Sequence, residues 1–302
     1  MEEAGSPALP LPQALDTPDA SASVVPASWA TLRQFTRARI ALGRAGHSLP
    51  TAPHLAFQLA HALARDAVHL PFEAAAVARD LEALGLAVLP LHSAAPDRAT
   101  YLQRPDLGRR LSDASRAALG QPGRAAPPGG AEQVDVVFMV GDGLSAQAVH
   151  QHATPLLAAT LDRLRASGSP WSVGPVALVE NARVAVGDEV GAGLGARCVV
   201  VLIGERPGLS SPDSLGVYLT WDPQPGLTDA RRNCISNVRP EGLPVVAAAV
   251  KLVQLLEGAR QLQTSGVALK DDSDDGSDHH VQGQTGVPVR SEDPARNFLL
   301  GP

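Results

Sequence analysis

The chain has 302 residues, of which 44% are hydrophobic and only 3% are aromatic. This composition is ordinary for a globular protein, and a core with so few aromatic residues has to be packed largely from Ala, Val and Leu. The formal net charge is −6 at pH 7. The chain therefore has no overall field that would attract a phosphate backbone, and we expect no nucleic-acid partner.

No targeting or membrane segment is expected. The N-terminus reads MEEAGSPALPLPQAL, without a basic region or a sustained apolar run, and later apolar runs are short or broken by charge, as at Lys251. Of the two cysteines, Cys198 lies in an apolar run and Cys234 in a polar segment read as a loop. They make no disulfide framework, which favours a reducing compartment. We therefore expect a cytoplasmic protein without a membrane partner.

The first part of the chain is expected to be helical. Residues 1–27 mix Pro, Ala, Ser and acids without periodicity, which is typical of a flexible arm. Gly43 and Gly85 are suited to ending helices. Residues 28–85 are therefore predicted to form a small α-helical domain. Its three segments with apolar residues at helical spacing are 28–43, 52–69 and 72–84.

Short β-rich runs separated by helical stretches follow. One of these helices is predicted to begin at Thr154 as N-cap with Pro155 in its first position, and a final helix covers about residues 244–263. The alternation indicates an α/β fold with a Rossmann-like, largely parallel sheet covered on both faces, over residues 86–270. The predicted strands are residues 86–91, 134–140, 175–179, 198–203 and 215–221.

Two segments are expected to lie outside this packed structure. Residues 120–132, GQPGRAAPPGGAE, are rich in Gly and Pro and are interpreted as an insertion within the α/β domain. Residues 271–302 begin with the acidic run DDSDDGSD and contain no core-forming pattern, so we expect a disordered acidic extension.

The sequence GDGLSA follows a predicted strand and matches the dinucleotide fingerprint at Gly141, Gly143 and Ala146. A nucleotide site also needs an acid at the end of the next strand. Asp162 has about the required offset but falls in a predicted helix. A tight strand-to-helix turn lining a cleft is thus preferred, and an NAD-dependent oxidoreductase remains an alternative.

The apolar run CVVVLIG ends in the polar segment GERPGLSSPDSLG. A buried strand followed by such a restricted loop is a usual position for ligand sites in α/β proteins. The loop combines a carboxylate at Glu205, a guanidinium at Arg206, and hydroxyl groups at Ser210, Ser211 and Ser214. It is suited to a polar ligand.

Several segments together resemble the small subunit of ethanolamine ammonia-lyase, in that family's order and spacing over most of residues 30–270. Besides IGERPGL and RRNCISN, they are FTRARIALGRAG, YLQRPDLGRRLS, DGLSAQAV, VGDEVGAGLGA and SGVALK. The resemblance implies a lyase that converts ethanolamine to acetaldehyde and ammonia with adenosylcobalamin, active only with its large subunit, and thus a role in ethanolamine catabolism. It also implies a higher-order hetero-oligomer of both subunits and, in some hosts, a bacterial microcompartment.

The resemblance carries three cofactor-binding residues over to this chain: Val184, Glu205 and Cys234. A backbone group at Val184, the carboxylate of Glu205 and the thiol of Cys234 each suit the amide-rimmed edge of a corrin. Taken without the family, each has an ordinary reading: Val184 as core, Glu205 as a partner of Arg206 or a helix cap, and Cys234 as a small buried hydrophobe. The family's substrate-binding residues belong to its large subunit, so no catalytic residue is assigned here.

The sequence offers no protein ligand for cobalt or another metal. The pattern D-x-H-x-x-G at Asp278, His280 and Gly283 is interpreted as chance, because it lies in the extension that the family lacks. The resemblance implies that the cobalamin keeps its own dimethylbenzimidazole ligand (base-on). The other histidines have no tetrahedral ligand spacing.

A basic stretch, with four arginines between residues 31 and 44, is the candidate docking surface for the large subunit, with Arg37 and Arg39 at its centre. A non-catalytic scaffold that uses the helical segments and the two ends of the chain remains a second alternative.

Overall fold

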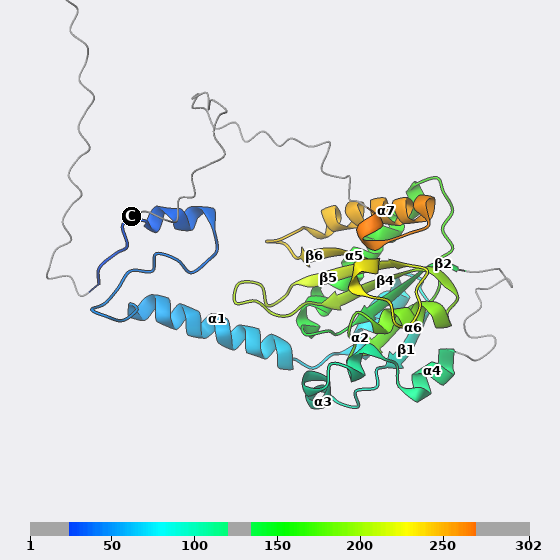
Figure 1. Cartoon of the computed structure of the whole chain (residues 1–302), viewed down its shortest axis with the longest axis horizontal. Helices are drawn as coiled ribbons and strands as arrows, with labels where there is room; N and C mark the ends of the chain where they lie inside the picture. The colour runs from blue at the N-terminus through cyan, green and yellow to red at the C-terminus, as the bar shows by residue number, and fades with distance from the viewer. Residues whose placement is uncertain (1–23, 120–133, 270–302) are drawn as a thin grey trace, which may run out of the picture. The chain divides into compact units, whose positions relative to one another are not determined.

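The computed structural model describes residues 24–119 and 134–269, whose centre is a six-stranded sheet in the order β1-β3-β2-β4-β5-β6 (Figure 1). The strands β1, β3, β2 and β4 are parallel, whereas β5 and β6 are antiparallel to their neighbours. The bounds are β1 (Val88–His92), β2 (Val134–Gly141), β3 (Val176–Glu180), β4 (Ala196–Gly204), β5 (Leu215–Trp221) and β6 (Arg232–Val238).

The helices of the described residues are α1 (Thr51–His69), α2 (Ala74–Ala83), α3 (Arg98–Gln103), α4 (Asp113–Leu119), α5 (Ala146–Ala166), α6 (Val186–Gly193) and α7 (Val245–Leu262). Short 3-10 turns are η1 (Ala30–Phe35), η2 (Leu107–Arg109), η3 (Asp229–Arg231) and η4 (Gly266–Ala268). None of the helices in 24–119 and 134–269 has the length and apolar character needed to cross a membrane.

The sheet is buried on both faces, as the alternation of strands and helices predicted. In β2, Val136 and Phe138 belong to the core cluster that contains residues of α2, α5 and α7, whereas Val137 and Met139 belong to the cluster that contains residues of α6. Successive residues of a strand point to opposite faces, so a continuous apolar run fills both cores. All five predicted strands and the final helix are confirmed.

The prediction of a largely parallel sheet is right only for the first four strands. The α/β class is confirmed, but the sheet is mixed, and its Rossmann-like character is not confirmed. The sequence analysis missed β6 because its residues, RNCISNV, are mostly polar; only Ile235 and Val238 are buried apolar side chains. This strand is paired on one side only, by β5, and such an edge strand needs fewer apolar residues.

The predicted helix over residues 28–43 is wrong. Only η1 is helical there, and it buries no residue, so its apolar side chains gain nothing from helical packing. The chain then forms isolated bridges, such as Val25 with Arg44. Gly43 has a φ of 79°, and a Cβ at this position would lie 2.7 Å from the carbonyl oxygen of Val25. The glycine therefore permits a close backbone approach and does not end a helix.

The predicted start of a helix at Thr154 is also wrong, because α5 begins nine residues earlier. Ser145 is the N-cap, and its Oγ accepts a hydrogen bond from the backbone N–H of Ala148 at 3.2 Å. Pro155 lies inside the helix. Buried residues at helical spacing, including Val149 and Leu156, continue across the proline, so packing against the sheet keeps the helix in one piece.

Three predictions lie outside the described residues. They concern residues 1–23 of the flexible arm, the insertion at 120–132 and the extension at 271–302, which contains Asp278 and His280. The division into a helical domain and an α/β domain stays a prediction; α2, assigned to the helical part, contributes Val77 and Leu81 to the core on the sheet.

Candidate functional site

A cavity of about 680 Å³ lies between the segment that precedes α6 and the antiparallel strands β5 and β6. Val184 and Cys234, two of the three predicted cofactor-binding residues, both line it although they are far apart in the sequence. The size is within the usual range of ligand sites, about 300–1,000 Å³. Its lining residues are Arg109, Arg183, Val184, Ala185, Tyr218, Leu227, Thr228, Asp229, Arg232 and Cys234.

The segment that carries Val184 is fixed by hydrogen bonds from outside it. The backbone N–H of Ala182 donates to Asp142 Oδ1 at 2.9 Å, and the Ala182 carbonyl accepts from the hydroxyl of buried Tyr101 at 3.0 Å. The next residue, Arg183, donates its backbone N–H to the carbonyl of Gly108 at 2.8 Å. These contacts fix the chain at the edge of the cavity, and a binding site needs such fixed groups to contact a ligand in one defined position.

The carboxylate of Asp142 is the central buried group in this arrangement. Besides the Ala182 amide, it accepts a hydrogen bond from Arg98 Nη1 at 3.0 Å, and its side chain is only 5% exposed. Burial raises the pKa of Asp142 to about 6, although the amide and the guanidinium both act in the opposite direction.

This pKa predicts a pH dependence of stability. The folded Asp142 holds its proton up to about pH 6, whereas the unfolded carboxyl releases it near 3.8. Its stabilising contribution is therefore complete below the unfolded pKa and is lost as the pH rises through the folded one. We expect the free energy of unfolding to fall by up to about 1.4 kcal/mol per pH unit between these values. Urea unfolding of the wild type and Asp142→Asn from pH 4 to pH 7 tests this, and equal slopes for both proteins would contradict it.

Cys234 lies on strand β6 and not in a loop, which corrects the sequence interpretation. Its side chain is exposed, so it is not the small buried hydrophobe of the alternative reading, and the residue pairs directly with Tyr218 on β5. Desolvation by the neighbouring protein atoms is the first cause that raises the pKa of the Cys234 thiol; Tyr218 acts in the opposite direction, and the Glu205 carboxylate adds to the increase. A thiol with a raised pKa is protonated at neutral pH, so it suits contact with a ligand edge and not nucleophilic attack.

Glu205, the third predicted residue, is not among the residues that line the cavity, but it lies near Tyr218 and Cys234, because its charge affects the pKa of both. Its Oε2 accepts hydrogen bonds from the Ser214 hydroxyl and from the backbone N–H of Asn237, the latter at 3.1 Å. A Cβ at Gly216 would lie 3.0 Å from Glu205 Cγ and 3.1 Å from the Tyr218 ring, so the missing side chain gives both groups room. The alternative of an ion pair with Arg206 is not found among the described residues.

Several polar groups of the loop after β4 are bonded to other parts of the chain. Ser145 donates its hydroxyl to the carbonyl of Pro212 at 2.8 Å, and Asp213 pairs with the buried Arg239 at 3.0 Å. Arg239 also donates to the carbonyl of Ser210 at 2.7 Å. These contacts make the loop a rigid support for Glu205, which differs from the open polar site that its composition predicted.

A buried ion pair joins the two walls of the cavity. Asp188 on α6 accepts hydrogen bonds at 2.6 and 2.8 Å from the two terminal nitrogens of Arg232, at the start of β6. Thr220 on β5 accepts a third hydrogen bond from Arg232 at 3.0 Å. The sequence analysis missed both charged residues, because nothing in the sequence shows that positions so far apart meet.

The segment GDGLSA forms the tight strand-to-helix turn that was preferred over a dinucleotide site. Gly143 has a φ of 58°, and a Cβ there would lie 2.2 Å from the carbonyl oxygen of Gly204. That carbonyl also accepts the backbone N–H of Leu144 at 2.9 Å. The turn is therefore packed against the chain itself, where the fingerprint requires room for a pyrophosphate. Asp162 lies on α5, as expected.

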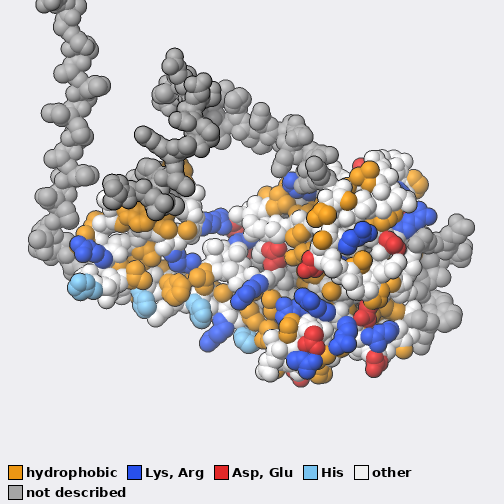
Figure 2. All heavy atoms as spheres, in the orientation of Figure 1, with side chains coloured by type: hydrophobic (Ala, Val, Ile, Leu, Met, Phe, Trp, Pro, Cys, Tyr) orange, Lys and Arg blue, Asp and Glu red, His pale blue; other side chains and the backbone are white. Residues whose placement is uncertain are grey.

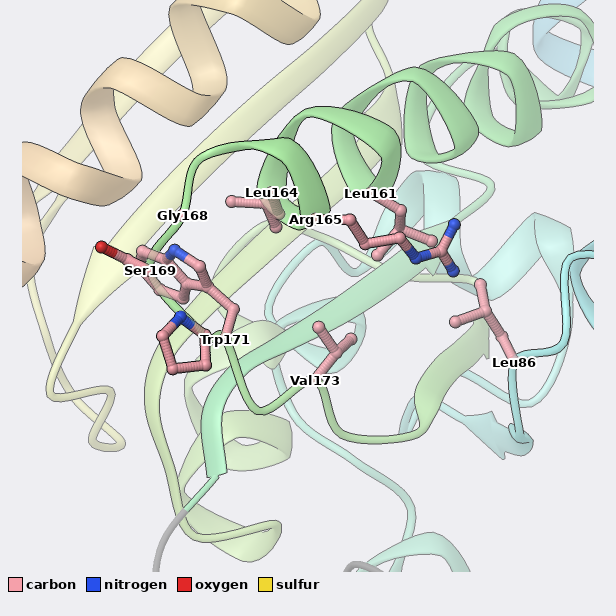
Figure 3. A pocket seen from close by; sticks show the side chains of 9 residues that line it. Leu86, Leu161, Leu164, Arg165, Gly168, Ser169, Trp171 and Val173 are labelled. Carbon is pink, nitrogen blue, oxygen red and sulfur yellow. The ribbon is translucent and has the colours of Figure 1, made fainter.

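A second cavity of about 480 Å³ is mainly apolar and lies between the end of α5 and the segment that follows it (Figure 3). None of the predicted site residues lines it. Arg260 lies over the Trp171 ring at 4.1 Å from the ring centroid. The lining residues are Leu86, Leu161, Leu164, Arg165, Gly168, Ser169, Pro170, Trp171 and Val173.

The fold defines an α/β protein with a cavity beside its antiparallel strands, and comparison with known proteins gives the family. The model of the ethanolamine ammonia-lyase light chain (EutC) matches residues 26–270. The ethanolamine ammonia-lyase small subunit of Ralstonia nicotianae is 61% identical over 282 residues, 93% of this chain and 97% of the relative. Small subunits from Azotobacter vinelandii and Pseudomonas fluorescens Pf0-1 are 60% and 54% identical, over 82% and 91% of this chain and 89% and 95% of the relatives. The chain belongs to the ethanolamine ammonia-lyase small-subunit family.

Proposed function

We propose that this chain is the cofactor-binding small subunit of an adenosylcobalamin-dependent ethanolamine ammonia-lyase, which converts ethanolamine to acetaldehyde and ammonia together with a large subunit. The observation that carries the proposal is the position of Val184 and Cys234 on opposite walls of one cavity, in a chain of this family. When bound, the cofactor would supply the radical chemistry, which begins with cleavage of its cobalt–carbon bond and which amino-acid side chains cannot provide.

The residues of the cavity fit the edge of a corrin. Val184 offers its backbone N–H to a corrin side-chain amide and Cys234 offers a protonated thiol, while the Glu205 carboxylate, near Tyr218 and Cys234, accepts amide hydrogen bonds. The large subunit would supply the other contacts of the cofactor. The role of this chain is to orient the cofactor and to exclude water from one side.

An exposed apolar surface supports association with a large subunit. Leu55, Leu59 and Leu63 follow each other at four-residue spacing on α1, and each is more than half exposed. Figure 2 shows hydrophobic side chains gathered on this N-terminal segment. Such a surface is typical of a protein–protein interface. Arg39, in the basic stretch predicted to dock, lies 5.9 Å from the Phe57 ring of the same helix. Assembly with several copies of both subunits, in the cytoplasm or in a microcompartment, belongs to the same proposal.

Reconstitution tests the proposal directly. The full chain is purified with the large subunit from the same genome, and acetaldehyde formed from ethanolamine is measured with adenosylcobalamin. We expect turnover only when both chains and the cofactor are present. Omission of each component in turn is the control. Associated, folded chains without turnover would overturn the proposed reaction, and turnover by the large subunit alone would overturn the proposed role of this chain.

A further inference from the structure

Three arginines line the cavity, and the described chain neutralises only one of them. Arg232 is bound by Asp188 through two hydrogen bonds, and its Nε lies 3.5 Å from the carboxylate of Asp229. In the described ranges 24–119 and 134–269, no carboxylate pairs with Arg109 or Arg183. The cavity therefore has an uncompensated positive edge.

Arg183 is held in position while its hydrogen-bonding capacity stays unused. Its backbone is fixed by the carbonyl of Gly108 at 2.8 Å, and its guanidinium carbon lies 4.4 Å from the centroid of the Tyr101 ring. The ring attracts the cation but accepts no ordinary hydrogen bond in its plane. The Nε of Arg183 is buried and has no partner in the described chain. Buried donors normally have acceptors, which points to an acceptor supplied by a ligand.

Arg109 adds a second charge at the same edge. It follows Gly108 directly, and the hydrogen bond between Gly108 and Arg183 joins the two chain segments. Arg109 is exposed and lines the same cavity. The carboxylate of Asp229 also lines the cavity and opposes an anion, but it is 92% exposed and is paired with Arg232. Both guanidinium groups therefore line one cavity, and planar guanidinium groups are well suited to bind the oxygens of a phosphate.

We propose that Arg183, together with Arg109, binds the phosphate group of the cofactor. This inference rests on the proposed function: adenosylcobalamin carries a single phosphodiester, in the chain that connects the corrin to its base, and no other anionic group. Arg183 and Val184 are neighbours, so the same segment would contact the corrin edge through its backbone and the phosphate through a side chain. The arginine pair would thereby set which way the cofactor lies in the cavity.

The test compares ligands that differ in the phosphate. Dissociation constants for cobalamin, cobinamide phosphate and cobinamide, which lacks the phosphate, are measured by equilibrium dialysis with the complex of both subunits. Variants are Arg183→Gln and Arg109→Gln, with Arg79→Gln on the exposed surface of α2 as the matched control. We expect Arg183→Gln to weaken cobalamin and cobinamide phosphate about tenfold, as for loss of a charge-assisted hydrogen bond. Cobinamide should change less than about twofold.

Each outcome has a distinct meaning. Equal weakening of all three ligands by Arg183→Gln would overturn the phosphate assignment, because it would indicate a packing role on Tyr101. Unchanged affinities for both arginine variants would overturn it as well. Arg109→Gln, at an exposed position, keeps the test valid if Arg183→Gln folds poorly, and we expect it to show the same ligand selectivity. If the unaltered complex binds none of the ligands, the proposed function itself fails.

Discussion

Replacement of Arg232 by Met is expected to lower the free energy of unfolding by about 3–5 kcal/mol. The reason is the uncompensated charge that remains: Asp188 is 1% exposed and accepts its two shortest side-chain hydrogen bonds from Arg232. Removal of one partner of a buried ion pair leaves the other charge without solvent and without a counter-ion. Urea unfolding monitored by circular dichroism measures the effect.

Two controls separate this effect from a general loss of arginine. The double variant Asp188→Leu with Arg232→Met removes both charges and is expected to recover most of the stability. Arg104→Met removes an ion pair with Asp106 whose side chains are 60% and 50% exposed, and it should cost less than about 1 kcal/mol. A cost for Arg232→Met as small as that for Arg104→Met would show that the pair does not hold α6 to β6.

Replacement of Gly143 by Ala is expected to cost about 2–5 kcal/mol, the second large effect. A side chain there meets two obstacles: the left-handed backbone, with a φ of 58°, and the carbonyl oxygen of Gly204, only 2.2 Å from the new Cβ. The contact is with backbone, which cannot move aside as the end of a flexible side chain can. The midpoint and slope of urea unfolding give the loss of stability.

Gly168→Ala is the matched control for this prediction. Gly168 has a φ of 75°, but a Cβ there would have no atom within 4 Å. Its cost should therefore be that of the left-handed conformation alone, about 1–2 kcal/mol. If both variants lose the same stability, the close approach of the GDGLSA turn to the end of β4 is not a constraint on the fold.

Local patterns in the sequence were sufficient for the elements whose side chains pack regularly. The strand CVVVLIG was predictable because successive residues, such as Val199 and Val200, fill the two cores on opposite sides of the sheet. The start of α5 was not predictable in this way, because Ser145 and Thr154 are both good N-caps. Only the packing of the residues between them against the sheet decides which one begins the helix. A sequence pattern does not contain that tertiary contact.

The candidate site was predictable only through resemblance to a family. Val184, Glu205 and Cys234 have ordinary side chains, and their local sequences contain no motif for a ligand. The cavity depends on pairings between distant segments, such as Tyr218 with Cys234 and Asp188 with Arg232. Among the residues that line the cavity, Arg183 alone has a buried donor without a partner in the described chain, and this feature exists only once the chain is folded.

The antiparallel pairing of β5 with β6 fixes which residues of β6 face the cavity and which face the core. Arg232 and Cys234 are two residues apart and share the cavity face, whereas Ile235 points into the core on the opposite face. A deletion of one residue between Arg232 and Ile235 would exchange these faces, so that a cavity-facing side chain enters the apolar core or a core side chain enters the cavity. The residue spacing within β6 is therefore as much a part of the cavity as the chemistry of its side chains, and insertions or deletions of one residue should be poorly tolerated there.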